Sequence, residues 1–222
     1  MFKFISSLFK NRQDKLCNVL DHLYQDINTI NSTQSSIIER ERLQLSDPTY
    51  TYGEIMPRSF GRLLELAEPQ TNDVFYDLGS GNGKAVFTAA LLYEWKKCYG
   101  IEFLPALHRI SIELLAHFYH LPKLKKYFPE KSFNIEFIQE DFFDTDLSNA
   151  NVIFINSTAF NITVWENLVN KLKRAQPGTR IIAISKKIDD KHFDKINESM
   201  LLQSWGMSSA FIYRRNEVVY TV

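Results

Sequence analysis

One stretch of ten residues constrains the fold of this chain more than any other. Residues 74–83 read Val-Phe-Tyr-Asp-Leu-Gly-Ser-Gly-Asn-Gly, an apolar run followed by glycines at alternate positions. An apolar run rich in β-branched and aromatic residues is typical of a buried strand. The glycines allow a tight turn and a close approach to a ligand, because they carry no Cβ. Lys84, Ala85 and Val86 then open a predicted helix whose first N–H groups are free. The stretch therefore predicts a strand, a ligand-binding turn and a helix.

The spacing of these glycines narrows the class of ligand. A dinucleotide fingerprint needs Gly at the position of Lys84, and a Walker phosphate loop needs Gly at Leu78 and Ser or Thr at Ala85. Glu102 closes the next strand-like run, where doubly wound folds place an acid on a ribose diol. With Asp77 at the first strand end, this pattern suits a ligand with a ribose and a positive charge but no phosphate. S-adenosylmethionine meets that description; the alternative is an ordinary strand-turn-helix with an acidic cap.

The composition excludes several classes of protein. Lys plus Arg and Asp plus Glu each number 26 among 222 residues, so no overall basic field is present to hold nucleic acid. Cys17 and Cys98 are far apart, which argues against a disulfide framework or a zinc cluster and suits a reducing compartment. His117 and His120 share a helix face, but no carboxylate or cysteine completes a metal site. No apolar span reaches the roughly 18 residues of a membrane helix. We expect a soluble intracellular protein, cytoplasmic by default, with nuclear and secreted-effector locations open.

The N-terminal quarter of the chain is expected to be helical. Apolar residues recur at helical spacing over 11–46, with a polar break at 31–33 and a second helix at about 35–45. The first ten residues read as a frayed or packed terminus. A non-helical connector at 49–54 leads to a helix over 55–67.

From position 73 the pattern alternates between strand and helix, which predicts a parallel sheet with helices on both faces. Residues 122–129 read as a basic loop. Strands at 200–203 and 210–220, joined by residues 204–209, predict a terminal hairpin. The other predicted strands are 73–78, 97–102, 134–139, 150–156 and 180–185, and the predicted helices between them are 84–95, 104–120 and 162–174.

An ordered series of short motifs carries a resemblance to a known family. The motifs are Tyr52-Gly53-Glu54, Asp77-Leu78-Gly79-Ser80-Gly81-x-Gly83, Tyr99-Gly100-Ile101-Glu102, Asp141-Phe142-Phe143 and Val152-Ile153-Phe154-Ile155-Asn156-x-x-Ala159-Phe160. Over roughly residues 45–190 this series resembles the catalytic domain of the disruptor-of-telomeric-silencing family, the non-SET histone-lysine methyltransferases. The resemblance implies an α/β class I methyltransferase domain at 51–222, Rossmann-like, with a mostly parallel seven-stranded sheet and a C-terminal hairpin. A small helical cap at 1–50 precedes it.

The resemblance also implies a role for each motif residue. Tyr52, Gly53 and Glu54 are expected over the methionine moiety of S-adenosylmethionine. Glu102 is expected on both ribose hydroxyls, and Asp141 on the adenine amine with Phe142 against the ring. Asn156 and Phe160 are expected to line a narrow channel for the lysine amine, with Tyr52 nearby as a third catalytic candidate. The floor of the site is expected from Asp77, Gly79, Ser80, Gly81 and Gly83.

Each of these positions has a plain structural alternative. Tyr52-Gly53-Glu54 alone reads as a turn, Asp141 and Phe142 as a loop acid and a core aromatic, and Phe160 as core. Asn156 reads equally as the N-cap of the next helix. Taken in order, the motifs favour the site.

Three departures from the family pattern bear on the substrate. Ser157 stands where the family usually has a second Asn, and Lys84 where Gln is usual. The family's channel tyrosine on the hairpin has no clean match, and Phe211 and Tyr213 are nearest. The leading hypothesis is an S-adenosylmethionine-dependent methyltransferase that acts on a protein lysine. The alternatives are a class I methyltransferase acting on RNA, DNA or a small molecule, and a cofactor-binding module without turnover.

Overall fold

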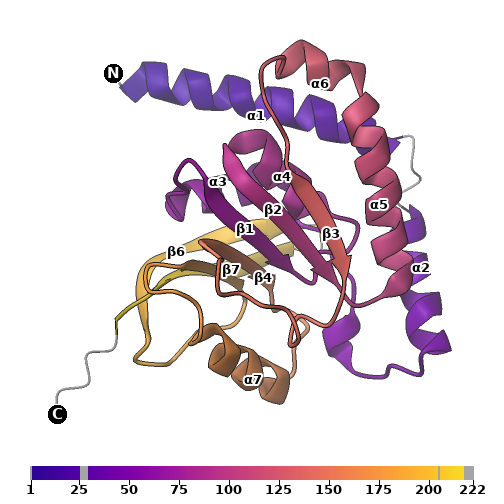
Figure 1. Cartoon of the computed structure of the whole chain (residues 1–222), viewed down its shortest axis with the longest axis vertical. Coiled ribbons are helices and arrows are strands. Elements are labelled where there is room, and N and C mark those ends of the chain that lie inside the picture. The colour runs from indigo at the N-terminus through magenta and orange to yellow at the C-terminus, as the bar shows by residue number, and fades with distance from the viewer. Residues whose placement is uncertain (1, 26–29, 205, 218–222) are drawn as a thin grey trace.

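The computed structural model describes the backbone of residues 2–25, 30–204 and 206–217, and the side chains of residues 11–25, 32–204 and 206–217. In this part of the chain seven strands form one sheet in the spatial order β3-β2-β1-β4-β5-β7-β6 (Figure 1). Pairing is parallel from β3 to β5, whereas β7 runs antiparallel to both β5 and β6. The predicted fold class is confirmed. The strands are β1 (Asp73–Leu78), β2 (Trp95–Glu102), β3 (Ile135–Gln139), β4 (Val152–Asn156), β5 (Arg180–Ile184), β6 (Phe193–Gln203) and β7 (Gly206–Arg215).

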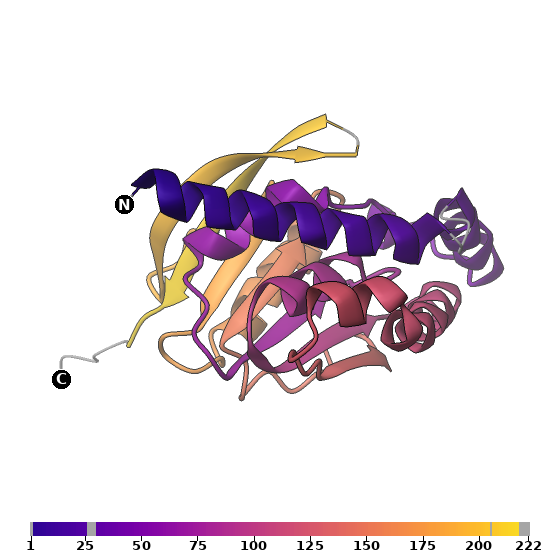
Figure 2. The same cartoon turned by 90° about the horizontal axis from the view of Figure 1, so that it is seen from above.

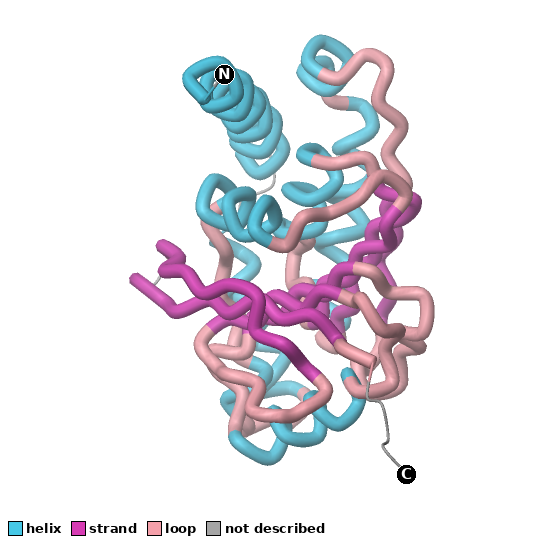
Figure 3. The backbone as a smooth tube through the Cα atoms, turned by 90° about the vertical axis from the view of Figure 1, so that its left-hand side faces the viewer, coloured by secondary structure: helices cyan, strands magenta, loops and turns pink. Residues whose placement is uncertain are grey.

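Helices cover both faces of the sheet, as Figure 3 shows. All six residues of β1 are buried, because Val74 and Tyr76 pack on the side of α7 while Phe75 packs on the opposite side. Burial on both faces explains why β1 reads as a continuous apolar run. The helices are α1 (Phe2–Gln25), α2 (Ile30–Arg42), α3 (Pro57–Leu66), α4 (Lys84–Leu92), α5 (Pro105–His120), α6 (Pro122–Tyr127) and α7 (Ile162–Leu172), with a short 3-10 helix η1 (Pro48–Tyr50).

The first helix belongs to the main core. Leu16, Val19, Leu20 and Leu23 of α1 are almost fully buried in the same cluster as α3 and α4. Figure 2 shows α1 lying across this layer of helices, and α1 contacts α3, α4, α5 and α6. α2 packs against α5. The N-terminal region is therefore fastened to the helices that follow β1 and β2.

This region differs from the sequence expectation at two points. α1 begins at Phe2, so the frayed alternative for the first residues is wrong, and α2 begins at Ile30, so the polar residues 31–33 belong to a helix instead of a break. Ser32 is buried and accepts a hydrogen bond from Asn82 Nδ2 at 3.2 Å. A hydrogen bond from the distant glycine loop thus pairs the buried Ser32 hydroxyl, although the polar residues around Ser32 in the sequence indicated a break between helices.

The C-terminal half differs in its loops. Residues 122–127 form α6, which starts at Pro122 and buries Leu124, so the expected basic loop contains a helix. β6 begins seven residues earlier than expected and β7 four residues earlier, and Gln203 pairs with Gly206, so the predicted loop at 204–209 is wrong. Only a few side chains of β6 are buried, and its polar outward residues interrupt the apolar pattern. β7 ends at Arg215, so residues 216–217 of the predicted strand are not part of it, and residues 218–220 lie outside the described residues.

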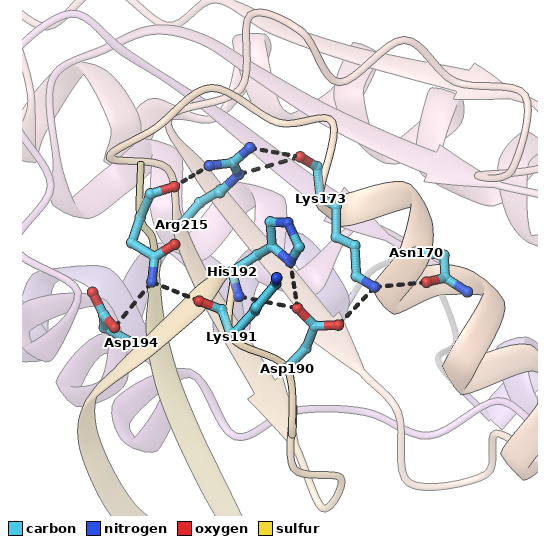
Figure 4. A network of polar contacts seen from close by, with 8 residues as sticks. Asn170, Lys173, Asp190, Lys191, His192, Asp194 and Arg215 are labelled. Atoms are coloured by element: carbon cyan, nitrogen blue, oxygen red, sulfur yellow. Dashed lines mark hydrogen bonds and ion pairs between the residues drawn. The ribbon is translucent and has the colours of Figure 1, made fainter. Parts of the chain in front are cut away.

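A polar network fastens the connection between β5 and β6 to α7 (Figure 4). Asp190 accepts hydrogen bonds from the Lys173 ammonium at 2.6 Å and from the His192 backbone at 3.0 Å, and it contacts His192 Nδ1 at 2.6 Å. Arg215 donates to the backbone oxygen of Lys173 at 3.0 and 3.2 Å. This network therefore fixes the connection between β5 and β6 against the end of α7.

Candidate active site

An open cavity of about 770 Å³ lies at the carboxyl ends of β1, β2 and β4. Open α/β sheets bind their ligands at this edge. Two further cavities of about 300 and 510 Å³ adjoin it. Tyr52, Gly53 and Asn156 line all three, so the connector ahead of α3 and the end of β4 separate the cavities. Of the residues singled out from the sequence, those that line a cavity are Tyr52, Gly53, Glu54, Asp77, Gly79, Ser80, Glu102, Asp141, Phe142, Asn156 and Phe160.

Gly81 and Gly83 lie in the glycine loop but line none of the three cavities. Both have a positive φ, +55° and +88°, which a side chain rarely tolerates. A Cβ on Gly81 would lie 2.4 Å from the Tyr52 ring, and one on Gly83 would lie 2.4 Å from the Phe137 ring. These two glycines allow the loop to pack tightly between Tyr52 and β3, which sets the shape of the cavity indirectly.

Glu102 is a buried carboxylate held from both sides by the backbone. Its Oε2 accepts from the Gly81 N–H and its Oε1 from the Leu104 N–H, both at 2.7 Å. Burial raises the pKa of Glu102, and the hydrogen bonds from the backbone amides oppose that rise. Each carboxylate oxygen keeps a free lone pair. The side chain is thus an oriented double acceptor at the end of β2.

Asp77, at the end of β1, has no hydrogen-bond partner within the described residues and is 3% exposed. Burial, and then the nearby charge of Glu102, raise the pKa of Asp77 well above its usual range. A buried carboxyl without a partner is costly in the ligand-free protein. Such a group is suited to a ligand that brings a positive charge.

Glu54 is the centre of a second polar cluster beneath the connector. Its Oε1 accepts from the Tyr52 hydroxyl at 2.6 Å and from Asn82 Nδ2 at 3.0 Å, and its Oε2 is ion-paired with Lys84. Burial and the charge of Glu54 raise the pKa of Tyr52 well above its usual value. Tyr24 of α1 donates to the backbone oxygen of Asn82 at 3.2 Å, and its ring lies 4.6 Å from the Lys84 nitrogen. The first helix therefore contacts the glycine loop directly.

The far end of the large cavity is aromatic. Phe142 stacks on Phe160 with ring centroids 5.7 Å apart, and Asp141 accepts from the Phe143 N–H at 2.9 Å. Tyr50 packs on Phe103 at 5.3 Å. A flat heterocycle with an exocyclic amine fits between such walls.

Sequence reasoning missed part of this wall. The position of Phe103, directly after the acid that ends β2, was the available signal for an aromatic lining residue. The residues of η1 carried no comparable signal, because their place depends on how the connector crosses the sheet. The lining residues that were missed are Thr49, Tyr50, Thr51, Leu78, Phe103, Leu104, Leu107, Phe143 and Val164 in the large cavity, Ile55, Asn82, Lys84, Ala85 and Phe154 in the second, and Thr158 and Ala159 in the third.

The third cavity opens beside the end of β4. Asn156 Oδ1 accepts from Thr158 Oγ1 at 2.9 Å, and Thr158 Oγ1 lies 2.9 Å from Ser185 Oγ. Ser157 points into the sheet, where its hydroxyl donates to the Ile184 backbone oxygen.

Neither candidate for a channel tyrosine reaches these cavities. Phe211 and Tyr213 are buried in the core on the side of α7, and the Tyr213 hydroxyl accepts from the Ile188 N–H at 3.0 Å.

Two further features concern the described residues alone. No three His, Cys, Asp or Glu side chains in these ranges are grouped as a metal ion would require. In the same part of the chain, no helix has the length and hydropathy needed to span a membrane.

Comparison with solved structures places this geometry in a known fold. An RNA methyltransferase from Salinibacter ruber, crystallised with S-adenosyl-L-homocysteine, is 24% identical with a TM-score of 0.57, covering 73% of this chain and 94% of that one. A putative methyltransferase from Escherichia coli is 18% identical with a TM-score of 0.56, covering 72% and 86% of the two chains. At this identity the likeness shows the fold, which is that of the class I methyltransferases.

Sequence comparison identifies the family. A histone H3 lysine-79 methyltransferase of Caenorhabditis elegans is 31% identical over 138 residues, which is 60% of this chain and 14% of that protein. A protein-lysine N-methyltransferase of Saccharolobus islandicus is 34% identical over 124 residues, 55% of this chain and 68% of that one. The chain thus corresponds to a small part of the nematode relative and to about two thirds of the archaeal one. The family model "Histone methylation protein DOT1" matches residues 35–219. The resemblance found in the motifs is confirmed, and the chain belongs to the DOT1 histone methylation family.

Proposed function

We propose that this protein transfers a methyl group from S-adenosylmethionine to a lysine side chain of a protein. The observation that carries the proposal is the pairing of Asp77 with Glu102 at neighbouring strand ends, one without a partner and one oriented by two backbone amides. Membership of the DOT1 family and the names of its relatives support the lysine acceptor.

The residues present fit the cofactor. Glu102 is an oriented acceptor for the ribose hydroxyls. Asp77 is a buried carboxyl that loses its proton and becomes the counter-anion when the cofactor's positive charge lowers its raised pKa. Asp141 accepts from the adenine amine, while Phe142 and Phe103 pack against the ring. When bound, S-adenosylmethionine supplies an activated methyl group on a sulfonium.

The acceptor amine enters through the third cavity, between Tyr52, Gly53 and Thr158. A free lysine has a pKa near 10.4 and must lose its proton before it attacks. A desolvated channel lowers the pKa of an amine, because burial disfavours its charged form. The Asn156 amide oxygen accepts an N–H of the neutral amine and so directs its lone pair. Positioning of this kind supplies much of the rate gain in a displacement whose leaving group is already activated.

The acceptor is a protein in preference to nucleic acid. Acidic and basic residues are equal in number over the whole chain, which argues against an overall basic field for a phosphate backbone. Both cysteines are free thiols, which supports work in a reducing, intracellular compartment.

The test is transfer of labelled methyl from S-adenosylmethionine to core histones and to total cell lysate. We expect label in protein that survives nuclease and is assigned to methyl-lysine by mass spectrometry. Label that nuclease removes would assign the acceptor to nucleic acid. Absence of label in any protein, with cofactor binding seen by calorimetry, would refute the transfer step.

A matched pair of variants tests the cofactor site. Glu102→Ala should weaken binding by about 1–3 kcal/mol, the value of lost hydrogen bonds to a charged group. Glu136→Ala on neighbouring β3 removes a half-exposed carboxylate paired with Lys97 and should leave the affinity unchanged. Equal affinities for both variants would show that Glu102 does not hold the ribose.

A further inference from the structure

The end of β4 carries a chain of hydroxyl groups that leads to Asn156. Thr158 Oγ1 donates its hydrogen to Asn156 Oδ1 at 2.9 Å. A threonine hydroxyl has a single hydrogen. Ser185 Oγ, 2.9 Å from Thr158 Oγ1, must therefore be the donor in the second bond. The hydrogen bonds thus run in one direction, from Ser185 through Thr158 to the amide oxygen of Asn156.

An independent backbone feature places Ser185 at the start of this chain. Ser185 has a φ of +71°, a conformation that residues other than glycine rarely adopt. Its N–H donates to the Ser209 backbone oxygen at 2.7 Å, which ties this residue to β7. Strained residues of this kind persist where neighbouring structure holds them, and they gather at functional sites. The strain here aims the Ser185 side chain across the end of the sheet toward Thr158.

We propose that Thr158 and Ser185 are positioning residues that orient Asn156 toward the acceptor amine. The proposal rests on the function proposed above. With one lone pair of Asn156 Oδ1 occupied by Thr158, the other stays available for an N–H of the acceptor. Thr158 and Asn156 both line the third cavity, through which the acceptor is proposed to enter. Phe211 and Tyr213 are buried away from the cavities, so neither can take this positioning role.

The decisive variant is Thr158→Val, which keeps the side-chain shape and removes the hydroxyl. We expect kcat on the protein that the wild type labels to fall by at least about tenfold, because a misdirected group in the reacting geometry costs this much or more. The Kd for S-adenosylmethionine should not change. Thr158→Ser should restore kcat. Thr179→Val, at the other end of β5, removes a hydroxyl that bonds to the Ala150 backbone oxygen and should leave kcat unchanged.

Two substitutions separate the hydroxyl of Ser185 from its backbone strain. Ser185→Ala removes the hydroxyl and keeps the strained Cβ, whereas Ser185→Gly removes both. If the hydroxyl matters, both variants lower kcat equally. If Ser185→Gly alone lowers it, the strain is responsible and the hydroxyl chain is refuted.

A measurement that needs no turnover completes the test. The side-chain amide resonances of Asn156, assigned by their loss in Asn156→Ala, should shift in Thr158→Val and in Ser185→Ala but not in Thr179→Val. Unchanged resonances together with wild-type kcat in Thr158→Val would overturn the proposal while the proposed function stands. If the wild type labels no protein although it binds cofactor, the proposed function fails instead.

Discussion

The carboxylate of Glu54 is ion-paired with the ammonium group of Lys84, which opens the helix behind the glycine loop. Both side chains are mostly buried, 21% and 17% exposed. This ion pair links the connector of residues 49–54 to the start of α4, directly after the glycine loop. The family pattern usually has Gln, a neutral amide, at position 84, whereas Lys84 makes an ionic contact here.

Lys84→Met should lower the free energy of unfolding of the ligand-free protein by about 1–3 kcal/mol, because Glu54 keeps only its bonds from Tyr52 and Asn82. Urea denaturation measures the change. Lys195→Met removes a pair with Glu198 whose two partners are about half exposed, and it should have no measurable effect. Equal losses in the two variants would show that the burial of the Glu54 pair is without consequence.

Asp77→Asn should stabilise the ligand-free protein at neutral pH by at least about 1 kcal/mol. The pKa of Asp77 is raised in the folded state, so the folded protein holds its proton more tightly than the unfolded chain. The contribution of this group is fully present below its unfolded pKa and is lost as the pH rises through the folded one. Denaturation curves from pH 4 to pH 8 should therefore diverge in favour of the variant as the pH rises.

The same variant should bind S-adenosylmethionine more weakly, because it lacks the anion. Binding to the wild type should release protons, since a cation beside Asp77 lowers its pKa. Calorimetry in buffers of different ionisation enthalpy measures this release. A release that persists unchanged in Asp77→Asn would assign the proton to another group.

Gly81→Ala should impair cofactor binding, whereas Gly178→Ala should not. Both positions have a positive φ, +55° and +89°, so both variants carry a backbone cost of about 1–2 kcal/mol. Only at Gly81 would the new Cβ meet a side chain, the Tyr52 ring at 2.4 Å, while nothing lies within 4 Å at Gly178. Displacing Tyr52 takes its hydroxyl away from Glu54. Calorimetric affinities that fall equally in both variants would mean that strain alone acts.

Asn156→Ala should leave cofactor affinity nearly unchanged and reduce methyl transfer by about 100-fold. Without the Asn156 amide oxygen, the lone pair of the acceptor amine is no longer directed toward the methyl group. Asn149→Ala is the matched control, since Asn149 accepts from the Tyr76 hydroxyl at 2.9 Å away from the cavities. Single-turnover measurements at saturating cofactor distinguish the two. A parallel loss of affinity and turnover in Asn156→Ala would show that its role is misassigned.

Asp190→Asn should cost about 1–3 kcal/mol of stability at pH 7 by weakening the network of Figure 4. Burial would raise the pKa of Asp190, but hydrogen bonds from Lys173 and His192 outweigh it and hold the pKa below its usual range. That contribution is present above the unfolded pKa and is lost as the pH falls through the folded one. The difference from the wild type should therefore shrink below about pH 4. Asp189→Asn, at the exposed neighbouring position, should show no such dependence.

The parts that sequence reasoning could place are those determined by neighbours along the chain. β1 was predicted with its observed bounds, because burial on both faces makes its apolar run continuous. The position of Glu102 followed from one strand-helix-strand repeat, since β1 and β2 pair in parallel and end at the same edge. Seven of the eleven cavity-lining residues predicted from motifs lie on or just after such strand ends, namely Asp77, Gly79, Ser80, Glu102, Asp141, Phe142 and Asn156.

The parts of the structure that sequence reasoning could not place depend on contacts between distant segments. The polar start of α2 is helical because Ser32 meets Asn82, and Lys84 is held by Glu54 from the connector. Phe103 becomes a wall residue only because η1 brings Tyr50 against it. None of these pairings follows from periodicity, which reports one segment at a time.

The place of β7 between β5 and β6 has a consequence for synthesis on the ribosome. Until residues 206–215 leave the exit tunnel, the apolar strand β5 has a bare edge with unpaired backbone groups, because its outer neighbour comes last in the order of translation. A stalled or cleaved nascent chain that lacks this strand would present Ile181, Ile182 and Ile184 to any other extended polypeptide nearby. Synthesis of the final strand thus covers the last open edge of β5, and until then the nascent chain carries an edge that is prone to aggregation.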